Sequence, residues 1–157
     1  MSDMITDGRP DGYTSLTPFL VCAPASAAID FYVTVFGATV VSRMDGADGT
    51  VMHAELDLGL GRLQLGDPSD EYGLRSPDGT PETVSSSTSL YVADVDAVFA
   101  RAVAAGAVVR EPPATFVTGD RFASIYDPFG HRWAIMTRVE DLTPAEVERR
   151  LADWANA

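Results

Sequence analysis

The fold of this chain is decided by a stretch that occurs twice: Ala25–Phe36 (ASAAIDFYVTVF) before Gly37-Ala38, and Val95–Ala105 (VDAVFARAVAA) before Gly106-Ala107. Both stretches have the apolar spacing of an amphipathic helix, and glycine commonly ends a helix. Gly106 follows Gly37 by 69 positions, and the same offset aligns the segments downstream without a gap. A supersecondary unit repeated in this way predicts a fold made of two copies.

Each copy is predicted to have the order strand, helix, strand, strand, strand, because one strand-like run precedes each helix and three follow it. The expected strands of the first unit (15–66) are 15–22, 39–44, 51–58 and 62–66. Those of the second unit (86–137) are 86–92, one run made of 108–110 and about 115–118 with a break at Pro112-Pro113, then 121–126 and 131–137. The sequence therefore predicts a single α+β domain over residues 1–157, with two tandem βαβββ units whose mixed, curved sheets form a concave cavity.

Two further segments complete the predicted architecture. Residues 67–85 are rich in Pro, Gly, Ser and Asp, which is typical of a linker or a mobile lid. Residues 142–155 form a predicted C-terminal helix with Thr143 as N-cap, Pro144 at the first helical position and Glu146 completing a capping box. Its apolar face is expected to pack on the domain or on a second subunit, and is formed by Val147, Leu151 and Trp154.

Composition excludes several classes of partner. The formal charge of −12 over 157 residues would repel a nucleic-acid backbone, and no apolar run approaches the roughly 20 residues that cross a bilayer. The first twelve residues lack the pattern of a signal peptide, so the expected compartment is the cytoplasm. Cys22 lies in an apolar run, where a buried structural thiol is expected. The acidic surface is explained by solubility, and it would also suit a cationic ligand.

Alternation along the strands separates a core face from an inward face. In 51–58, Met52, Ala54, Leu56 and Leu58 are assigned to the core, which leaves His53 and Glu55 facing the cavity. His53 and Glu55 are the candidate catalytic residues, and the same face holds polar and aromatic groups typical of a ligand pocket. Half-exposed sheet residues without a ligand are the alternative. The candidate ligand-binding residues are Phe19, Gln64, Ser87, Ser89, Tyr91, Phe122, Ser124, Tyr126 and Arg132.

Several motifs resemble one known superfamily. The helix ending Ile29-Asp30-Phe31-Tyr32 with Phe36-Gly37-Ala38, and the turn Asp127-Pro128-Phe129-Gly130, are similar to the vicinal oxygen chelate proteins. These include glyoxalases, bleomycin-resistance proteins and extradiol dioxygenases. Further segments resemble the PhnB-like branch: Thr17-Pro18-Phe19-Leu20, 52–56 (MHAEL), Tyr91-Val92, 94–99 (DVDAVF) and Gly119-Asp120-Arg121. The resemblance spans about residues 15–137 and implies fold and branch without fixing a reaction.

The resemblance also implies where a metal would bind. In the metal-dependent glyoxalases of this superfamily, four ligands come from the first and last strands of both units, and these positions fall on Thr17, Gln64, Ser87 and Ala134. Alanine has no donor, and the other side chains are weak ligands for a divalent ion. We therefore expect no metal and no other cofactor. His53 and Glu55 could supply two ligands of a replacement site, but no third is evident.

Three functions are consistent with these residues. The favoured one is a metal-independent small-molecule-binding protein, forming a homodimer, in which aromatic side chains stack on an aromatic or cationic ligand and Glu55 supplies charge. The alternative is a lyase, isomerase or dioxygenase that uses His53 and Glu55 as metal ligands or as a general base. The third is a structural dimer without a ligand.

Overall fold

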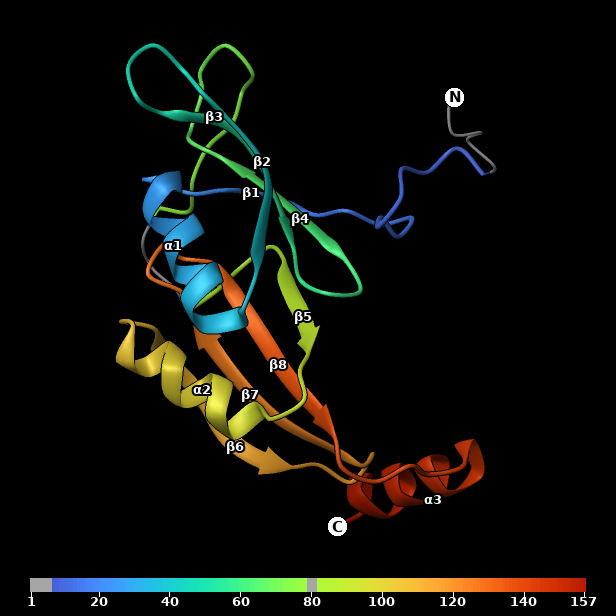
Figure 1. Ribbon diagram of the computed structural model, residues 1–157. Helices are drawn as coiled ribbons and strands as arrows, with labels where there is room; N and C mark the ends of the chain where they lie inside the picture. The colour runs from blue at the N-terminus through green and yellow to red at the C-terminus, as the bar shows by residue number, and fades with distance from the viewer. Residues whose placement is uncertain (1–6, 79–81) are drawn as a thin grey trace. The chain divides into compact units, whose positions relative to one another are not determined.

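The computed structural model describes residues 7–78 and 82–157 (Figure 1). These residues form two compact units, one before and one after residues 79–81 in the sequence. The first unit contains β1 (Phe19–Val21), α1 (Ala25–Phe36), β2 (Thr39–Asp45), β3 (Val51–Asp57) and β4 (Arg62–Gly66). The second contains β5 (Ser87–Tyr91), α2 (Val95–Ala104), β6 (Val108–Thr115), β7 (Asp120–Tyr126) and β8 (Arg132–Arg138), followed by α3 (Pro144–Ala155). The predicted α+β fold with two βαβββ units and a C-terminal helix is confirmed.

Each unit has one four-stranded mixed sheet. The strand orders are β1-β4-β3-β2 and β5-β8-β7-β6, so the two sheets have the same topology. In both, the first strand runs parallel to the last, and the other neighbours are antiparallel. The helix after the first strand supplies the long crossover that a parallel pair requires. The two edges of each sheet are therefore its first and second strands.

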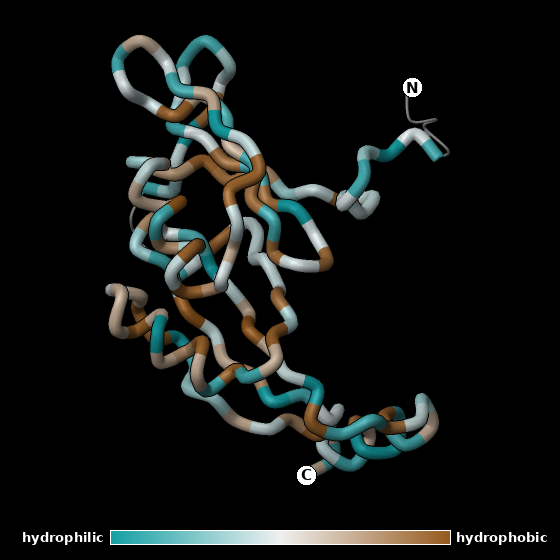
Figure 2. The backbone as a smooth tube through the Cα atoms, in the orientation of Figure 1, coloured by the Kyte–Doolittle hydropathy of each residue, from teal (hydrophilic) through white to brown (hydrophobic). Residues whose placement is uncertain are grey.

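The core of each unit lies between the helix and one face of its sheet. In the first unit Leu56, Leu63 and Leu65 are fully buried, and in the second Trp133 and Ile135 are fully buried. These positions alternate along their strands as the predicted core face requires. Apolar segments follow the strands and the two crossover helices, whereas α3 is largely hydrophilic (Figure 2). Cys22 is also fully buried, as expected for a structural thiol.

The ungapped alignment of the two units is wrong by one residue at one turn. Ala54 pairs with Leu65 in the first unit, and Ala123 pairs with Ile135 in the second. The offset is therefore 69 at β3 and β7 but 70 at β4 and β8, because the turn at 127–131 is one residue longer than the turn at 58–61. With this correction Leu63 corresponds to Trp133 and Leu65 to Ile135, all of them in the core.

The prediction for residues 51–58 is wrong at its beginning. Val51 is fully buried and Met52 is 46% exposed, so Met52 does not belong to the core. The register between β2 and β3 shifts at this point, because Met44 pairs with His53 while Asp45 pairs with Val51. Such a bulge places two residues of one strand opposite one of its partner and reverses the alternation. Met52 therefore joins the face opposite α1.

Three predicted strand boundaries also differ from the structure. The first strand begins at Phe19 rather than at residue 15. Pro112-Pro113 does not break the strand, since β6 runs on to Thr115 with register shifts on both sides of Glu111. Proline is tolerated there because β6 is an edge strand. Residues 116–119 are a hairpin turn, not an extended run, closed by the Phe116 N–H donating to the Asp120 carbonyl at 2.8 Å.

The beginning of each crossover helix is held by a side chain from just beyond β4 or from within β8. Asp67 Oδ1 accepts the Ala25 N–H at 3.0 Å, and Thr137 Oγ1 accepts the Val95 N–H at 2.8 Å. Asp67 Oδ2 also accepts the Val51 N–H at 2.7 Å. The predicted linker is thus ordered at its start, and Ser69 and Leu74 form a β-bridge.

The C-terminal helix begins at Pro144 as predicted, but the Glu146 side chain bonds Arg149 and Arg150 rather than completing the capping box. Thr143 accepts the Glu146 N–H, and Pro144 is the first helical residue. Trp154 packs edge-on against Phe116, with ring centroids 5.3 Å apart, and remains 58% exposed. Within the described part of the chain, no helix has the length and apolar content needed to cross a membrane.

Candidate functional site

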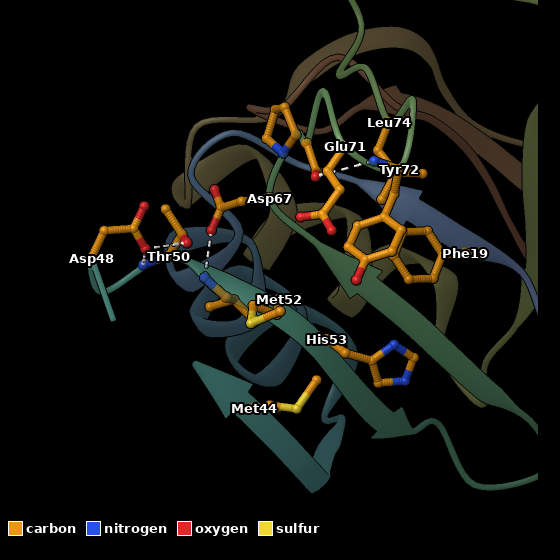
Figure 3. A pocket seen from close by; sticks show the side chains of 13 residues that line it. Phe19, Met44, Asp48, Thr50, Met52, His53, Asp67, Glu71, Tyr72 and Leu74 are labelled. Carbon is orange, nitrogen blue, oxygen red and sulfur yellow. Dashed lines mark hydrogen bonds between the residues drawn. The ribbon is translucent and has the colours of Figure 1, made fainter. Parts of the chain in front are cut away.

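A cavity of about 550 Å³ lies on the face of the first sheet opposite α1 (Figure 3). Phe19 of β1, Met44 of β2, and Met52 and His53 of β3 contribute its sheet side. The segment after β4 adds Tyr72 and other residues, so the supposed linker is one wall of the cavity. Its complete lining is Phe19, Met44, Asp48, Thr50, Val51, Met52, His53, Asp67, Pro68, Ser69, Glu71, Tyr72 and Leu74.

Two local features of the sequence create this space. The bulge at the start of β3 turns Met52 onto the cavity side. Gly66, at the end of β4, has no side chain, and a Cβ there would lie 2.7 Å from the Met52 carbonyl oxygen and 3.3 Å from Phe19 Cζ. The Phe19 ring can therefore lie against the backbone, with its centroid 5.9 Å from that of His53.

The cavity is acidic. Asp48 accepts the Thr50 hydroxyl at 2.6 Å, and Asp67 is occupied by the backbone N–H groups of Ala25 and Val51. No hydrogen bond or ion pair to another described residue engages the Glu71 carboxylate. In Figure 3 this carboxylate lies beside the Tyr72 ring and points into the cavity. Glu71 is therefore the carboxylate available to a ligand.

His53 and Glu55 lie together, as predicted, within a larger hydrogen-bonded group. His53 Nε2 is 3.5 Å from Glu55 Oε1, and the Gln64 amide donates to the same oxygen at 3.2 Å. Hydrogen bonding with Tyr13 is the main cause that holds the pKa of the Glu55 carboxyl below its usual range, against the opposing effect of burial. The same bond raises the pKa of Tyr13. The Glu55 side chain is thus already engaged by the side chains of His53 and Gln64.

We predict that Tyr13→Phe raises the pKa of Glu55 toward its ordinary value, because the largest cause of the lowering is removed. A carboxylate with a lowered pKa stabilises the folded state above its unfolded pKa and loses that contribution as the pH falls through the folded pKa. In the variant this contribution is smaller, and its loss is complete at a higher pH, because the folded pKa lies closer to the unfolded one. Carboxyl ¹³C chemical shifts titrated by NMR measure the pKa, with Asp30→Asn on the exposed side of α1 as control. An unchanged Glu55 pKa would contradict the assignment.

The second unit has a smaller cavity, of about 380 Å³, on the face of its sheet opposite α2. It is lined by Glu111, Ala114, Thr115, Phe116, Thr118, Asp120, Phe122 and Met136. Asp120 is occupied by the Tyr91 hydroxyl at 2.9 Å and by Arg138 Nε at 2.8 Å. Hydrogen bonding and charge from Asp120 raise the pKa of Arg138. This cavity is mainly apolar and its acidic groups are paired.

The structure places the predicted site residues in several groups. Phe19 and His53 line the cavity of the first unit, while Glu55 and Gln64 belong to the hydrogen-bonded group beside it. Phe122 lines the cavity of the second unit, and Tyr91 bonds Asp120 at its rim. The others lie on the same sheet: Ser87, Ser89, Ser124, Tyr126 and Arg132. The predicted cavity shared by the two halves stays a prediction.

Sequence reasoning missed four residues of the first unit. Tyr13 precedes the first predicted strand, and Glu71 and Tyr72 lie in a segment whose composition indicates a linker. The sequence places Met44 at the end of a predicted strand but does not indicate on which side of the sheet its side chain lies. An aromatic residue beside an acidic one, as at Glu71-Tyr72, is the signal that could have drawn attention to that segment.

Comparison with known proteins assigns the family. The model of the glyoxalase/bleomycin resistance protein/dioxygenase superfamily matches residues 16–135. The chain belongs to this superfamily. Uncharacterized protein Mb0911c of Mycobacterium bovis is 36% identical over 144 residues, which are 88% of this chain and 92% of that protein. TioX from Micromonospora sp. ML1 has 27% identity and a TM-score of 0.61, covering 83% of this chain and 100% of its own.

The PhnB protein of Bacillus cereus also has a TM-score of 0.61, with 22% identity and coverage of 79% of this chain and 99% of its own. At this identity the likeness shows the glyoxalase fold and no more. The predicted superfamily is thus confirmed, whereas the PhnB-like branch remains a proposal.

The metal positions of metal-dependent glyoxalases do not fit a divalent ion here. Thr17 lies outside β1, and the Gln64 amide donates to Glu55. Ser87 is exposed, and Ala134 has no donor atom. Within residues 7–78 and 82–157, no cluster of three or more His, Cys, Asp and Glu side chains is arranged to hold a metal. The side chains at these four positions therefore lack the imidazoles and carboxylates that such an ion requires.

Proposed function

We propose that this glyoxalase-superfamily protein binds an organic cation with an aromatic or bulky apolar part, without a metal, in the cavity of its first unit. The observation that carries this proposal is the combination of aromatic and thioether walls with the available carboxylate of Glu71. A cavity of about 550 Å³ lies in the usual size range of small-molecule sites. The chain's formal charge of −12 would also attract cations.

The walls suit such a ligand for separate reasons. The faces of Phe19 and Tyr72 can attract a cation through their ring quadrupoles. Met44 and Met52 adapt their shape to an apolar group, because thioether side chains are flexible and polarizable. Glu71 supplies the opposite charge. We further propose that the protein is of the PhnB-like branch, homodimeric and cytoplasmic.

The alternative, catalysis by His53 and Glu55, has less support from the geometry. Glu55 Oε1 already accepts from His53 and Gln64. A general base or metal ligand needs a lone pair directed at the substrate or ion. In this arrangement Glu55 orients its neighbours, and His53 presents its ring to the cavity.

Calorimetric titration tests the proposed function with benzyltrimethylammonium as cation and benzyl alcohol as neutral comparison. We expect the cation to bind, and Glu71→Gln to weaken its binding about tenfold, because the bound cation loses its charged partner. Asp30→Asn, on the exposed side of α1, is the matched control and should leave the affinity unchanged.

Chelator treatment completes the test. Affinity for the ammonium probe should be the same before and after EDTA, with no zinc, nickel, iron or manganese found by elemental analysis. Three results would each refute the proposal. The wild-type protein and Glu71→Gln could bind the ammonium probe equally well, the two probes could bind with equal affinity, or EDTA could abolish binding.

A further inference from the structure

The register of the second sheet fixes three rows of side chains on the face opposite α2. The strands β5, β8 and β7 are neighbours (Figure 1), and residues paired across them lie on the same side of the sheet. The first row contains an arginine, the second contains small residues, and the third contains aromatic and thioether groups. These rows are Ser87–Arg132–Tyr126, Ser89–Ala134–Ser124 and Tyr91–Met136–Phe122.

The repeat supplies an internal comparison for Arg132. Its counterpart is Arg62, the first residue of β4. Arg62 forms an ion pair with Asp57 at 3.1 Å, and its Nε donates to the Gly12 carbonyl at 3.2 Å. The N-terminal segment and the neighbouring strand thus satisfy both the charge and the Nε donor of this arginine.

Arg132 lacks both of these partners. Tyr126 takes the place of Asp57, so the cross-strand neighbour is neutral and accepts from Arg132 Nη2 at 3.0 Å. Among the described residues no carboxylate pairs with Arg132, and its Nε is buried without a hydrogen-bond partner. A buried, unpartnered donor on a charged group costs free energy, and such groups commonly mark a site for a missing ligand or ion.

The neighbouring row has smaller side chains than its counterpart in the first unit, and Ser124 in it is buried. At the corresponding place in the first unit, Gln64 and Glu55 fill the sheet face and bond each other. The second unit has Ala134 and Ser124 in their place. Beyond them lie Phe122 and Met136, which also line the apolar cavity of this unit. A charged group, a region of small side chains and an apolar wall therefore follow one another along the sheet.

We propose that this face of the second unit is a separate binding site for an aromatic carboxylate, with the carboxylate on Arg132 Nε and the ring toward Phe122. Guanidinium groups match carboxylates in geometry and charge. A single arginine balances the single charge of a carboxylate, whereas a phosphate dianion would leave an excess negative charge in a protein that is already acidic. Its residues are different from those of the cation site proposed in the first unit.

Calorimetry with benzoate and phenyl phosphate as probes tests the site. We expect benzoate to bind more tightly than phenyl phosphate, and Arg132→Gln to weaken benzoate about ten- to hundredfold, as expected for the loss of a charged hydrogen bond. Arg132→Lys keeps the charge but not the Nε donor. Its affinity for benzoate should lie between that of the wild-type protein and that of Arg132→Gln. Arg62→Gln changes the equivalent, already paired arginine and should leave benzoate affinity unchanged.

Ser87→Asp keeps the test decisive if Arg132 variants fold poorly. Ser87 is exposed and is in register with Arg132, so the new carboxylate can pair with the guanidinium. We expect it to abolish benzoate binding and to leave binding of benzyltrimethylammonium intact. Benzoate binding that survives both Arg132→Gln and Ser87→Asp, or that is lost with Arg62→Gln, would overturn the proposed site. Tighter binding of phenyl phosphate would overturn the carboxylate assignment.

Discussion

Replacing Asp127 with alanine lowers the free energy of unfolding by about 3–5 kcal/mol, the effect expected when a buried hydrogen-bonded charge network is broken. Asp127 is 3% exposed and lies in the turn between β7 and β8. Its Oδ1 accepts the N–H groups of Phe129 and His131 at 3.0 and 2.9 Å, and its Oδ2 accepts Trp133 Nε1 at 2.9 Å. Alanine would remove the acceptor shared by these three donors in a region where the Asp127 side chain is buried.

Urea unfolding followed by tryptophan fluorescence measures this effect, because Trp133 is one of the two tryptophans and is fully buried. Asp127→Asn should cost less than alanine, since its amide oxygen can still accept from one side of the turn. Asp141→Ala, an exposed aspartate of the same unit, should change stability by no more than about 0.5 kcal/mol. An Asp127→Ala cost as small as that of the control would show that the turn forms without this carboxylate.

The fold could be predicted because its signals are local and repeated. Leu63 and Leu65 alternate with polar neighbours, as do Trp133 and Ile135, and all four are fully buried. The helix ends could also be predicted, because a glycine follows α1 and a threonine caps α3. These features depend on spacing within one segment, which a single sequence records directly.

The features that were missed depend on pairing between segments. The bulge at Val51-Met52 is a property of the register with β2, and the extra residue of the 127–131 turn becomes visible only when core positions are matched across units. Pro112-Pro113 predicts a break in the strand because proline lacks an N–H. An edge strand does not need every backbone N–H to pair with a neighbour, so β6 continues through both prolines. Local composition contains no information on which strand is at an edge.

The candidate site was partly predictable for the same reason. His53 and Phe19 lie on the cavity side, as strand alternation indicated, but the wall opposite them comes from Glu71 and Tyr72 in the presumed linker. That segment is ordered by a contact its own composition cannot indicate, the hydrogen bonds from Asp67 to two distant backbone groups. A polar segment next to a sheet can therefore form part of a site.

Asp67 should consequently be the most sensitive residue of that segment. We expect Asp67→Ala to lower the free energy of unfolding by about 3 kcal/mol, because two hydrogen bonds to a charged group are lost at about 1.5 kcal/mol each. One of these bonds holds the first residue of α1 and the other the first residue of β3. Loss of both would also displace the 69–74 wall, so benzyltrimethylammonium binding should weaken in the same variant.

Thr137 provides the matched comparison in the second unit. Its hydroxyl accepts the Val95 N–H at the start of α2 and donates to the Val92 carbonyl, with no charge involved. Thr137→Val should therefore cost about 1–2 kcal/mol, less than Asp67→Ala, and should leave binding of the ammonium probe unchanged. Urea unfolding and calorimetry of the two variants measure both quantities. If Thr137→Val proved the costlier change, the Thr137 contact at the start of α2, and not the Asp67 contact at the start of α1, would be the stronger link between helix and sheet.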